Sequence, residues 1–152
     1  MSEPLKVVEE EQAPELACSL VPVEGLFLIW DEITPFLEGV VEVSHGDLTI
    51  NCIRNKLLRG DSQLLVVTDG TKILCATTVN VETYGSGKRV LLAPVIGGEG
   101  IEIWGDLLIE TVRGIAKQRL CDEIRGLGRE GWKRLWGKKG LKPIMTIYSL
   151  EV

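Results

Sequence analysis

The sequence feature that most constrains the fold is a β-hairpin signal near the middle of the chain. Residues 63–68 read QLLVVT and residues 72–81 read KILCATTVNV, with an Asp69-Gly70 turn between them. Strands of this composition on either side of an Asp-Gly pair favour an antiparallel hairpin. Residues 89–96 follow as RVLLAPVI, an unbroken apolar run that is typical of a strand covered on both faces.

Helical periodicity lies on both sides of these strands. It predicts a first helix over 23–33, which Thr34-Pro35 interrupts, and a second helix over 36–43. A third helix is expected to begin near Asp47 as its N-cap and to stop at Gly60. The remaining predicted elements are a long helix over 101–120, a short strand over 121–128, a short helix over 130–136 and a final alternating strand over 143–150. This order predicts an α+β (α/β layered) fold with a mixed sheet.

The composition is that of one globular domain without a membrane span, and its bulk charge argues weakly against a nucleic-acid partner. The chain has 152 residues, 45% of them hydrophobic, and a net charge of -5. Residues 1–19 are acidic and contain prolines, which predicts a flexible arm without a secretory signal, and residues 20–152 form the predicted domain. The apolar run 26–30 is too short to span a bilayer.

Cysteine and histidine usage argues against a metal centre. The four cysteines, Cys18, Cys52, Cys75 and Cys121, form no close pair, and His45 is the only histidine. A zinc site would therefore need an unusual ligand set. We expect reduced thiols in a cytosolic compartment.

Four segments from about residue 20 to the end resemble the GNAT superfamily of N-acetyltransferases, in the compact form found in genes of tailed bacteriophages. They read WDEITPFL, QLLVVTDGTKILCATTV, LLAPVIGGEGIEIWGDLLIETV and GREGWKRLWGKKGLKPIMTIYSLEV. The resemblance implies a mixed, mostly antiparallel sheet flanked by helices. Coenzyme A is the cofactor of that family, but we expect no cofactor here unless the chain is an acetyltransferase, in which case acetyl-CoA is expected. The order of the elements follows the family more closely than the motifs do.

The family's pyrophosphate loop reads Gln/Arg-x-x-Gly-x-Gly/Ala, and its backbone amides hold coenzyme A at a helix N-terminus. Here Val95 stands at the Gln/Arg position, and Glu99 and Glu102 would repel a diphosphate. We expect these acids, with Asp106, to stabilise the helix dipole and to cap the free amides instead. If coenzyme A binds, the resemblance implies binding through Gly97, Gly98, Gly100 and Ile101.

The family's last motif, Asn-x-x-Ala-x-x-x-Tyr-x-Lys-x-Gly-Phe, supplies a tyrosine that returns a proton to the departing thiolate. Aligning Gly140-Leu141 with Gly-Phe places Arg129 on the asparagine, Trp132 on the alanine, Trp136 on the tyrosine and Lys138 on the lysine. An indole cannot serve as a general acid near neutral pH. The tryptophans are expected to fill the site, or to act as core or interface anchors; the predicted interface comprises Arg129, Trp132, Arg134 and Trp136.

No catalytic residue is predicted. The side chains considered as base or acid are Glu82, His45, Glu102, Tyr84 and Tyr148. None has a spacing that distinguishes it from a solvated or core residue.

Two functions of different class remain open. The first is a non-catalytic structural or interaction protein, associated with or internal to a virion, whose partners are virion components or copies of itself. The alternative is an acetyl-CoA-dependent N-acetyltransferase with a variant loop. The basic C-terminal residues admit nucleic-acid binding as a third and weakest possibility. The expected location is the host cytoplasm or the virion.

Overall fold

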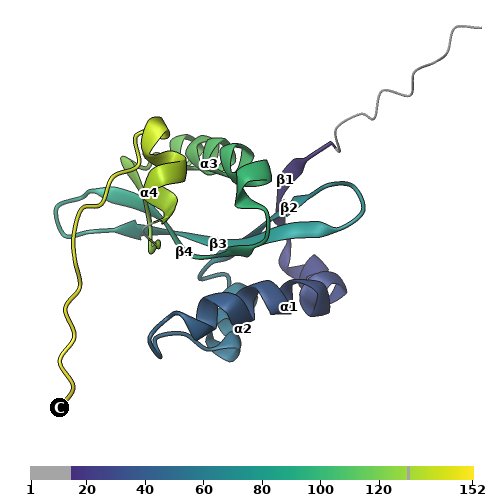
Figure 1. Cartoon of the computed structure of the whole chain (residues 1–152), viewed down its shortest axis with the longest axis horizontal. Coiled ribbons are helices and arrows are strands. Elements are labelled where there is room, and N and C mark those ends of the chain that lie inside the picture. Colours follow the sequence, from purple (N-terminus) through teal and green to yellow (C-terminus); the bar gives the residue numbers. More distant parts are fainter. Residues whose placement is uncertain (1–14, 130) are drawn as a thin grey trace, which may run out of the picture.

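The computed structural model describes residues 15–129 and 131–152, and within them one five-stranded sheet organises the chain (Figure 1). The strand order is β1-β2-β3-β4-β5, and only β4 and β5 run parallel. The strands are β1 (Ala17–Val21), β2 (Gln63–Thr68), β3 (Ile73–Thr83), β4 (Arg89–Gly98) and β5 (Glu123–Gly126). The mixed, mostly antiparallel α+β sheet predicted from the sequence is confirmed.

Helices cover the sheet on both faces. One face carries α1 (Leu26–Glu42) and α2 (Ile50–Arg59), and the other carries α3 (Ile101–Gln118) and α4 (Gly131–Trp136), as Figure 1 shows. Two short 3₁₀ turns, η1 (Val23–Gly25) and η2 (Gly137–Lys139), precede α1 and follow α4. None of the helices described is long and apolar enough to cross a membrane.

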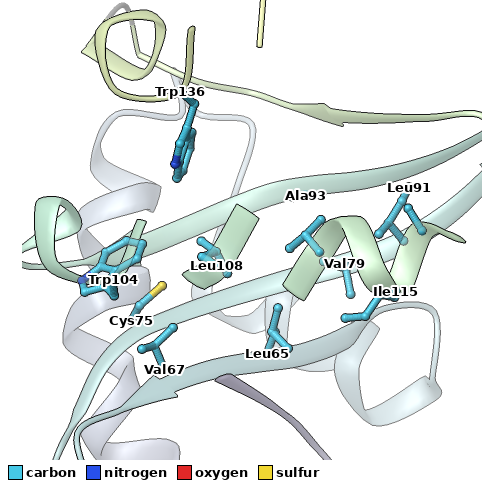
Figure 2. Close-up of a cluster of buried hydrophobic side chains, with 12 residues drawn as sticks. Leu65, Val67, Cys75, Val79, Leu91, Ala93, Trp104, Leu108, Ile115 and Trp136 are labelled. Atoms are coloured by element: carbon cyan, nitrogen blue, oxygen red, sulfur yellow. The ribbon is translucent and has the colours of Figure 1, made fainter. Parts of the chain in front are cut away.

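Alternation along the strands creates two hydrophobic cores. In β2, Leu64 and Val66 pack under α1 and α2, whereas Leu65 and Val67 face α3. The α3 core is the larger, and Figure 2 shows its side chains gathered between the strands and the helices; they include Cys75, Val79, Leu91, Trp104, Leu108 and Trp136. Apolar side chains therefore pack against both faces of the sheet.

The predicted β2–β3 hairpin is confirmed, and its turn is held by one carboxylate. Asp69 Oδ1 accepts hydrogen bonds from the Thr71 N–H, the Thr71 hydroxyl and the Lys72 N–H, at 2.9–3.0 Å. Gly70 adopts a φ of 92°, which a side chain would disfavour.

Strand β4 has a partner on both edges over only part of its length. Its pairing with β3 shifts register between Thr78 and Asn80, and Pro94 lies on β4 at this bulge, where proline's missing donor is tolerated. On its other edge β4 pairs with β5 only from Val90 to Ala93. Beyond Ala93 β4 continues to Gly98 without this partner, because β5 ends at Gly126, the residue that pairs with Ala93. We call the space beside this part of β4 the gap.

The two helices predicted over 23–33 and 36–43 form a single helix in the structure, α1. Pro35 lies inside α1, and the Thr34 hydroxyl bonds to the Trp30 carbonyl. Ile33 and Leu37, on either side of the proline, are both fully buried in the same core. Their burial outweighs the backbone hydrogen bond that proline removes.

The third predicted helix begins later than expected. Thr49, rather than Asp47, caps α2: its Oγ1 accepts the Cys52 N–H, and Cys52 Sγ accepts the Thr49 N–H. Asp47 lies in the preceding turn, where its N–H bonds to the Ser44 carbonyl. The stop at Gly60 is confirmed, because this residue is the left-handed C-cap of α2.

Both ends of the domain differ from prediction. Strand β1 pairs with β2 from Ala17 onward, so residues 17–19 belong to the sheet and not to the arm; residues 1–14 lie outside the described part of the chain. At the other end, residues 143–150 form no strand and are exposed throughout. An alternating sequence becomes a strand only where a second strand is available to pair with it.

Asp69 makes stability depend on pH. The hydrogen bonds from Lys72 and Thr71 hold the pKa of its carboxyl below the ordinary 3.8. Since the folded-state pKa is the lower one, this stabilisation is complete above about pH 4 and is lost as the pH falls through the folded-state pKa.

We therefore expect Asp69→Ala to destabilise the protein near neutral pH, and the difference from wild type to shrink below pH 4. Urea unfolding at several pH values measures it. Ser86→Ala, in the β3–β4 turn, is the non-ionisable control and should show a pH-independent effect. A difference for Asp69→Ala that stays constant down to pH 2 would contradict the assignment.

Candidate functional site

The candidate site is the gap beside β4, where β4 continues past the end of β5. Helices α3 and α4 roof it, and a residual cavity of about 30 Å³ remains inside. The lining is apolar and consists of Ala93, Ile96, Leu108, Ile109, Val112, Ile124, Gly126, Trp132, Trp136 and Leu141. A single water molecule needs about 10–15 Å³ of such volume, so the cavity has room for little more than that.

Trp132 closes the gap from the β5 side. Its ring lies so close to the end of β5 that a Cβ added to Gly128 would come within 2.2 Å of the ring, and one added to Gly126 within 3.0 Å. The two glycines and the indole therefore fit one another sterically. This relation between residues four and six positions apart is a contact that the sequence did not reveal.

Trp136, the last residue of α4, closes the gap on the side of α3. It is 2% exposed, and its Nε1 donates to the Gly105 carbonyl at 3.1 Å. Its ring meets that of Trp132 edge to face, with centroids 5.2 Å apart. A Cβ on Gly105 would lie 3.3 Å from Trp136 Nε1, so a small residue in α3 allows this approach. Trp136 is therefore a core residue in this chain, and its side chain is not available to a partner.

The predicted phosphate-binding glycines Gly97 and Gly98 lie at the end of β4 and have packing reasons to be glycine. A Cβ at Gly97 would lie 2.3 Å from the Phe36 carbonyl oxygen, where α1 crosses the strand. A Cβ at Gly98 would lie 2.5 Å from the Leu74 carbonyl oxygen and 3.0 Å from the Trp104 ring. The two distances to carbonyl oxygens, 2.3 and 2.5 Å, are shorter than a Cβ atom tolerates.

Gly100 and Ile101 complete the turn into α3. Gly100 is the N-cap with a φ of 73°, and Ile101 is the first residue of the helix, half-buried against the core. The expected capping by acids is wrong, because no side chain in the described part of the protein accepts a hydrogen bond at this N-cap. Glu102 lies in the first turn, where its negative charge still interacts favourably with the positive end of the helix dipole. This interaction needs proximity and not a hydrogen bond.

The side chains considered as acids or bases are not brought together at the gap. Glu82 is exposed and accepts a hydrogen bond from Asn80, and His45 is exposed in the α1–α2 turn. Tyr84 lies under the Arg125 guanidinium at 5.3 Å, and Tyr148 is 91% exposed near the C-terminus. Glu102 is exposed on α3. None of the five lines the cavity.

The cysteines offer no activated nucleophile at the gap. Burial raises the pKa of the Cys75 thiol to about 12, and burial likewise raises that of Cys18. Both side chains pack in or against the α3 core. Among the described residues, no three His, Cys, Asp or Glu side chains gather into a metal-binding group.

Basic residues surround the outer surface of α4. Arg129, Lys133 and Arg134 are exposed, whereas Trp132 between them is half-buried. Lys139 pairs with Glu110 at 3.5 Å, and Arg113 donates to the Lys139 carbonyl, which ties η2 to α3. Of the predicted interface residues, Arg129 and Arg134 are thus at the surface.

The sequence matches no protein-family model and no curated protein. Solved structures do match. An aminoglycoside acetyltransferase from an uncultured soil metagenomic sample superposes with a TM-score of 0.69 at 13% identity, over 91% of this chain and 99% of that one. A GCN5-related N-acetyltransferase from Ralstonia eutropha gives 0.67 at 12% identity, over 90% and 99%. A ribosomal-protein-alanine N-acetyltransferase from Brucella melitensis gives 0.67 at 12% identity, over 91% and 99%.

The glycine at the end of β4 should be essential for stability. Gly97→Ala drives a methyl group against the Phe36 backbone, and we expect a loss of at least about 2 kcal/mol in the free energy of unfolding. Gly114→Ala is the matched control, because this exposed α3 glycine has open space around it and should gain about 0.5–1 kcal/mol. Denaturant unfolding tests both, and equal effects would refute the packing explanation.

Trp136 should behave as a core residue. Trp136→Ala leaves a cavity between α3 and α4, and we expect a loss of about 3–5 kcal/mol. Trp136→Phe keeps most of the volume but loses the hydrogen bond to the Gly105 carbonyl, so its cost should be clearly smaller. Thermal or chemical unfolding of the two variants decides it; a loss below about 1 kcal/mol for Trp136→Ala would contradict the core placement.

Proposed function

We propose that this chain, which has the fold of the GCN5-related N-acetyltransferases, is a non-catalytic interaction protein whose cofactor site is filled by its own side chains. The fold alone does not determine activity, so the proposal depends on the site. Its principal support is that the Trp132 ring packs against Gly126 and Gly128 and so fills the gap beside β4. The remaining cavity of about 30 Å³ does not accommodate a coenzyme A arm.

The phosphate end of the site supports the same proposal. The steric environment of Gly97 and Gly98 accounts for both glycines without a phosphate ligand. Glu99 and Glu102 are exposed beside the start of α3, where each would repel a diphosphate. A family resemblance in the glycines therefore carries little weight for cofactor binding here.

The residue aligned with the family's tyrosine also supports the proposal that this chain is non-catalytic. Trp136 stands where the family keeps its tyrosine, and its N–H donates to the Gly105 carbonyl. An indole N–H does not titrate near neutral pH, so this residue cannot protonate a thiolate. The side chains considered as alternative acids or bases lie outside the lining of the cavity.

We propose further that the protein acts through contacts with other protein chains, as a component of a phage particle. The exposed Arg129 and Arg134 flank the half-buried Trp132, a combination common at interfaces. The resemblance to compact members from tailed bacteriophages supplies the virion setting. Mass spectrometry of purified particles should then detect the chain.

An acetyl-CoA-dependent N-acetyltransferase is the second candidate, and one observation favours it. Among the described residues no side chain caps the N-terminus of α3, and although the Ile103 N–H donates to the Gly100 carbonyl, the amides of Ile101 and Glu102 are left for an anion. The similar structures include proteins described as acetyltransferases. In this alternative the pyrophosphate would lie at Gly98–Gly100, and Trp132 would have to move.

Titration with acetyl-CoA separates the two candidates. A ligand that binds only the folded protein raises its melting temperature. We expect no saturable rise for the wild type at millimolar acetyl-CoA, because the gap is filled and the loop is acidic. Calorimetry of the same mixtures provides an independent readout.

Two variants make this test sharper. Trp132→Ala empties the gap, and a gain of acetyl-CoA binding in this variant alone would identify Trp132 as the residue that blocks the site. Trp30→Ala, on α1 at the opposite face of the sheet, is the matched control for the same change of side chain. Saturable binding to the wild type would refute the non-catalytic proposal.

A further inference from the structure

Two neighbouring apolar side chains near the start of α1 face water. Phe27 is 66% exposed and Leu28 is 88% exposed. The stripe that continues from Phe27 along the helix, at intervals of three or four residues, is exposed as well and consists of Asp31, Pro35, Glu38 and Glu42. Large apolar side chains that lie together at a surface mark a contact with another protein. We call this face of α1, with Phe27, Leu28, Asp31, Glu38 and Glu42, the acidic surface.

The charge of the acidic surface is not neutralised by its neighbours. Helix α1 contains four acidic residues and no basic one. The basic residues of the adjacent α2 are mostly engaged elsewhere: Arg54 lies 5.8 Å from the centre of the Trp30 ring, and Arg59 pairs with Asp61 at 3.1 Å. Only Lys56 remains as an exposed cation of α2, so this side of the domain keeps a negative charge.

A surface of opposite charge lies around α4. Residues 131–142 contain five basic residues and no acidic one. Lys139 pairs with Glu110, and the exposed acids Glu102 and Asp106 lie on the first turns of α3. We call the exposed residues of α4 and its flanks the basic surface; they are Leu127, Arg129, Lys133, Arg134 and Lys138.

The two surfaces lie on opposite faces of the sheet, because α1 covers one face and α4 the other (Figure 1). The sheet and both hydrophobic cores lie between them, so the two surfaces cannot meet within one copy of the chain. Each surface also exposes apolar side chains beside its charges, and Leu127 of the basic surface is 69% exposed. Both therefore have the mixture of apolar and charged groups that a protein partner covers.

We propose that the acidic surface of one copy binds the basic surface of the next copy, head to tail. Charge complementarity identifies a second copy as the partner, since each surface supplies the charge that the other lacks. A contact between two different surfaces is heterologous, so it continues into an open chain or closes into a ring of three or more copies. The proposal rests on the interaction function proposed above, because it names the partner.

Sedimentation of the full chain over a range of concentrations tests the assembly. At about 0.02 M salt we expect a mean mass that rises beyond twice the 16.8 kDa of one chain. Raising the salt to about 0.5 M screens the exposed charges and should weaken association by about tenfold or more. A wild type that stays monomeric at low salt, or whose mass stops at a dimer, overturns the proposal.

Charge reversal then locates the contact. Lys133→Glu/Arg134→Glu brings like charges together and should weaken association by about 30-fold or more. Lys72→Glu/Lys117→Glu is the matched control, because it changes the net charge equally at exposed lysines of the β2–β3 turn and of α3. The control should change association by less than about threefold. An equal effect of both variants would show that net charge alone governs association, and it would overturn the proposal.

Mixing two reversed variants identifies the surfaces as partners. Asp31→Lys/Glu38→Lys reverses the acidic surface and should by itself weaken association as strongly as Lys133→Glu/Arg134→Glu. In an equimolar mixture of the two, each reversed surface meets the other reversed surface, and the unchanged surfaces also meet. We expect the mixture to associate at concentrations at which neither variant does so alone. A mixture that stays monomeric overturns the proposed pairing.

Failure of this assembly is distinguishable from failure of the proposed function. The substituted residues lie outside the lining of the cavity, so titration of the same proteins with acetyl-CoA tests the filled gap independently. Saturable binding of acetyl-CoA to the wild type would refute the non-catalytic function whatever its mass. A monomeric wild type that binds no acetyl-CoA would overturn only the head-to-tail contact.

Discussion

The end of β5 at Gly126, opposite Ala93 of β4, is the constraint on which the rest of the structure depends. Parallel pairing ends there, and β4 continues to Gly98 with its outer edge open to the space below α3 and α4. A gap of this kind in a hydrophobic layer must be occupied, because empty space forfeits both burial and dispersion contacts. In this chain two indoles occupy it, and three glycines, Gly105, Gly126 and Gly128, allow the indoles to approach the backbone.

This arrangement changes what the glycine-rich segment means. A row of glycines between a strand and a helix is associated with phosphate binding, because small residues let an anion reach free amides. Here Gly97 admits the backbone of α1, and Gly98 admits the backbone of β3 and the ring of Trp104. The same residues thus satisfy a packing requirement that exists with or without a ligand, and only their surroundings distinguish the two cases.

The C-terminal segment, residues 142–152, leaves the domain beside the filled gap. Leu141 closes the lining of the cavity, and the exposed segment continues from that point into solvent.

The sequence by itself determined the local elements: the hairpin with its Asp69-Gly70 turn, the amphipathic α3, the stop at Gly60 and the layered fold class. These follow from turn chemistry and from periodicity, both of which act between near neighbours in the chain. Tertiary structure decided the rest. Burial of Ile33 and Leu37 carried α1 through Pro35, and pairing with β2 turned residues 17–21 into a strand. Residues 143–150 alternate as a strand does and yet have no partner in the described chain. Gly97, Gly98, Gly126 and Gly128 are glycines because only the folded chain brings other atoms within 3.0 Å of the place where a Cβ would lie.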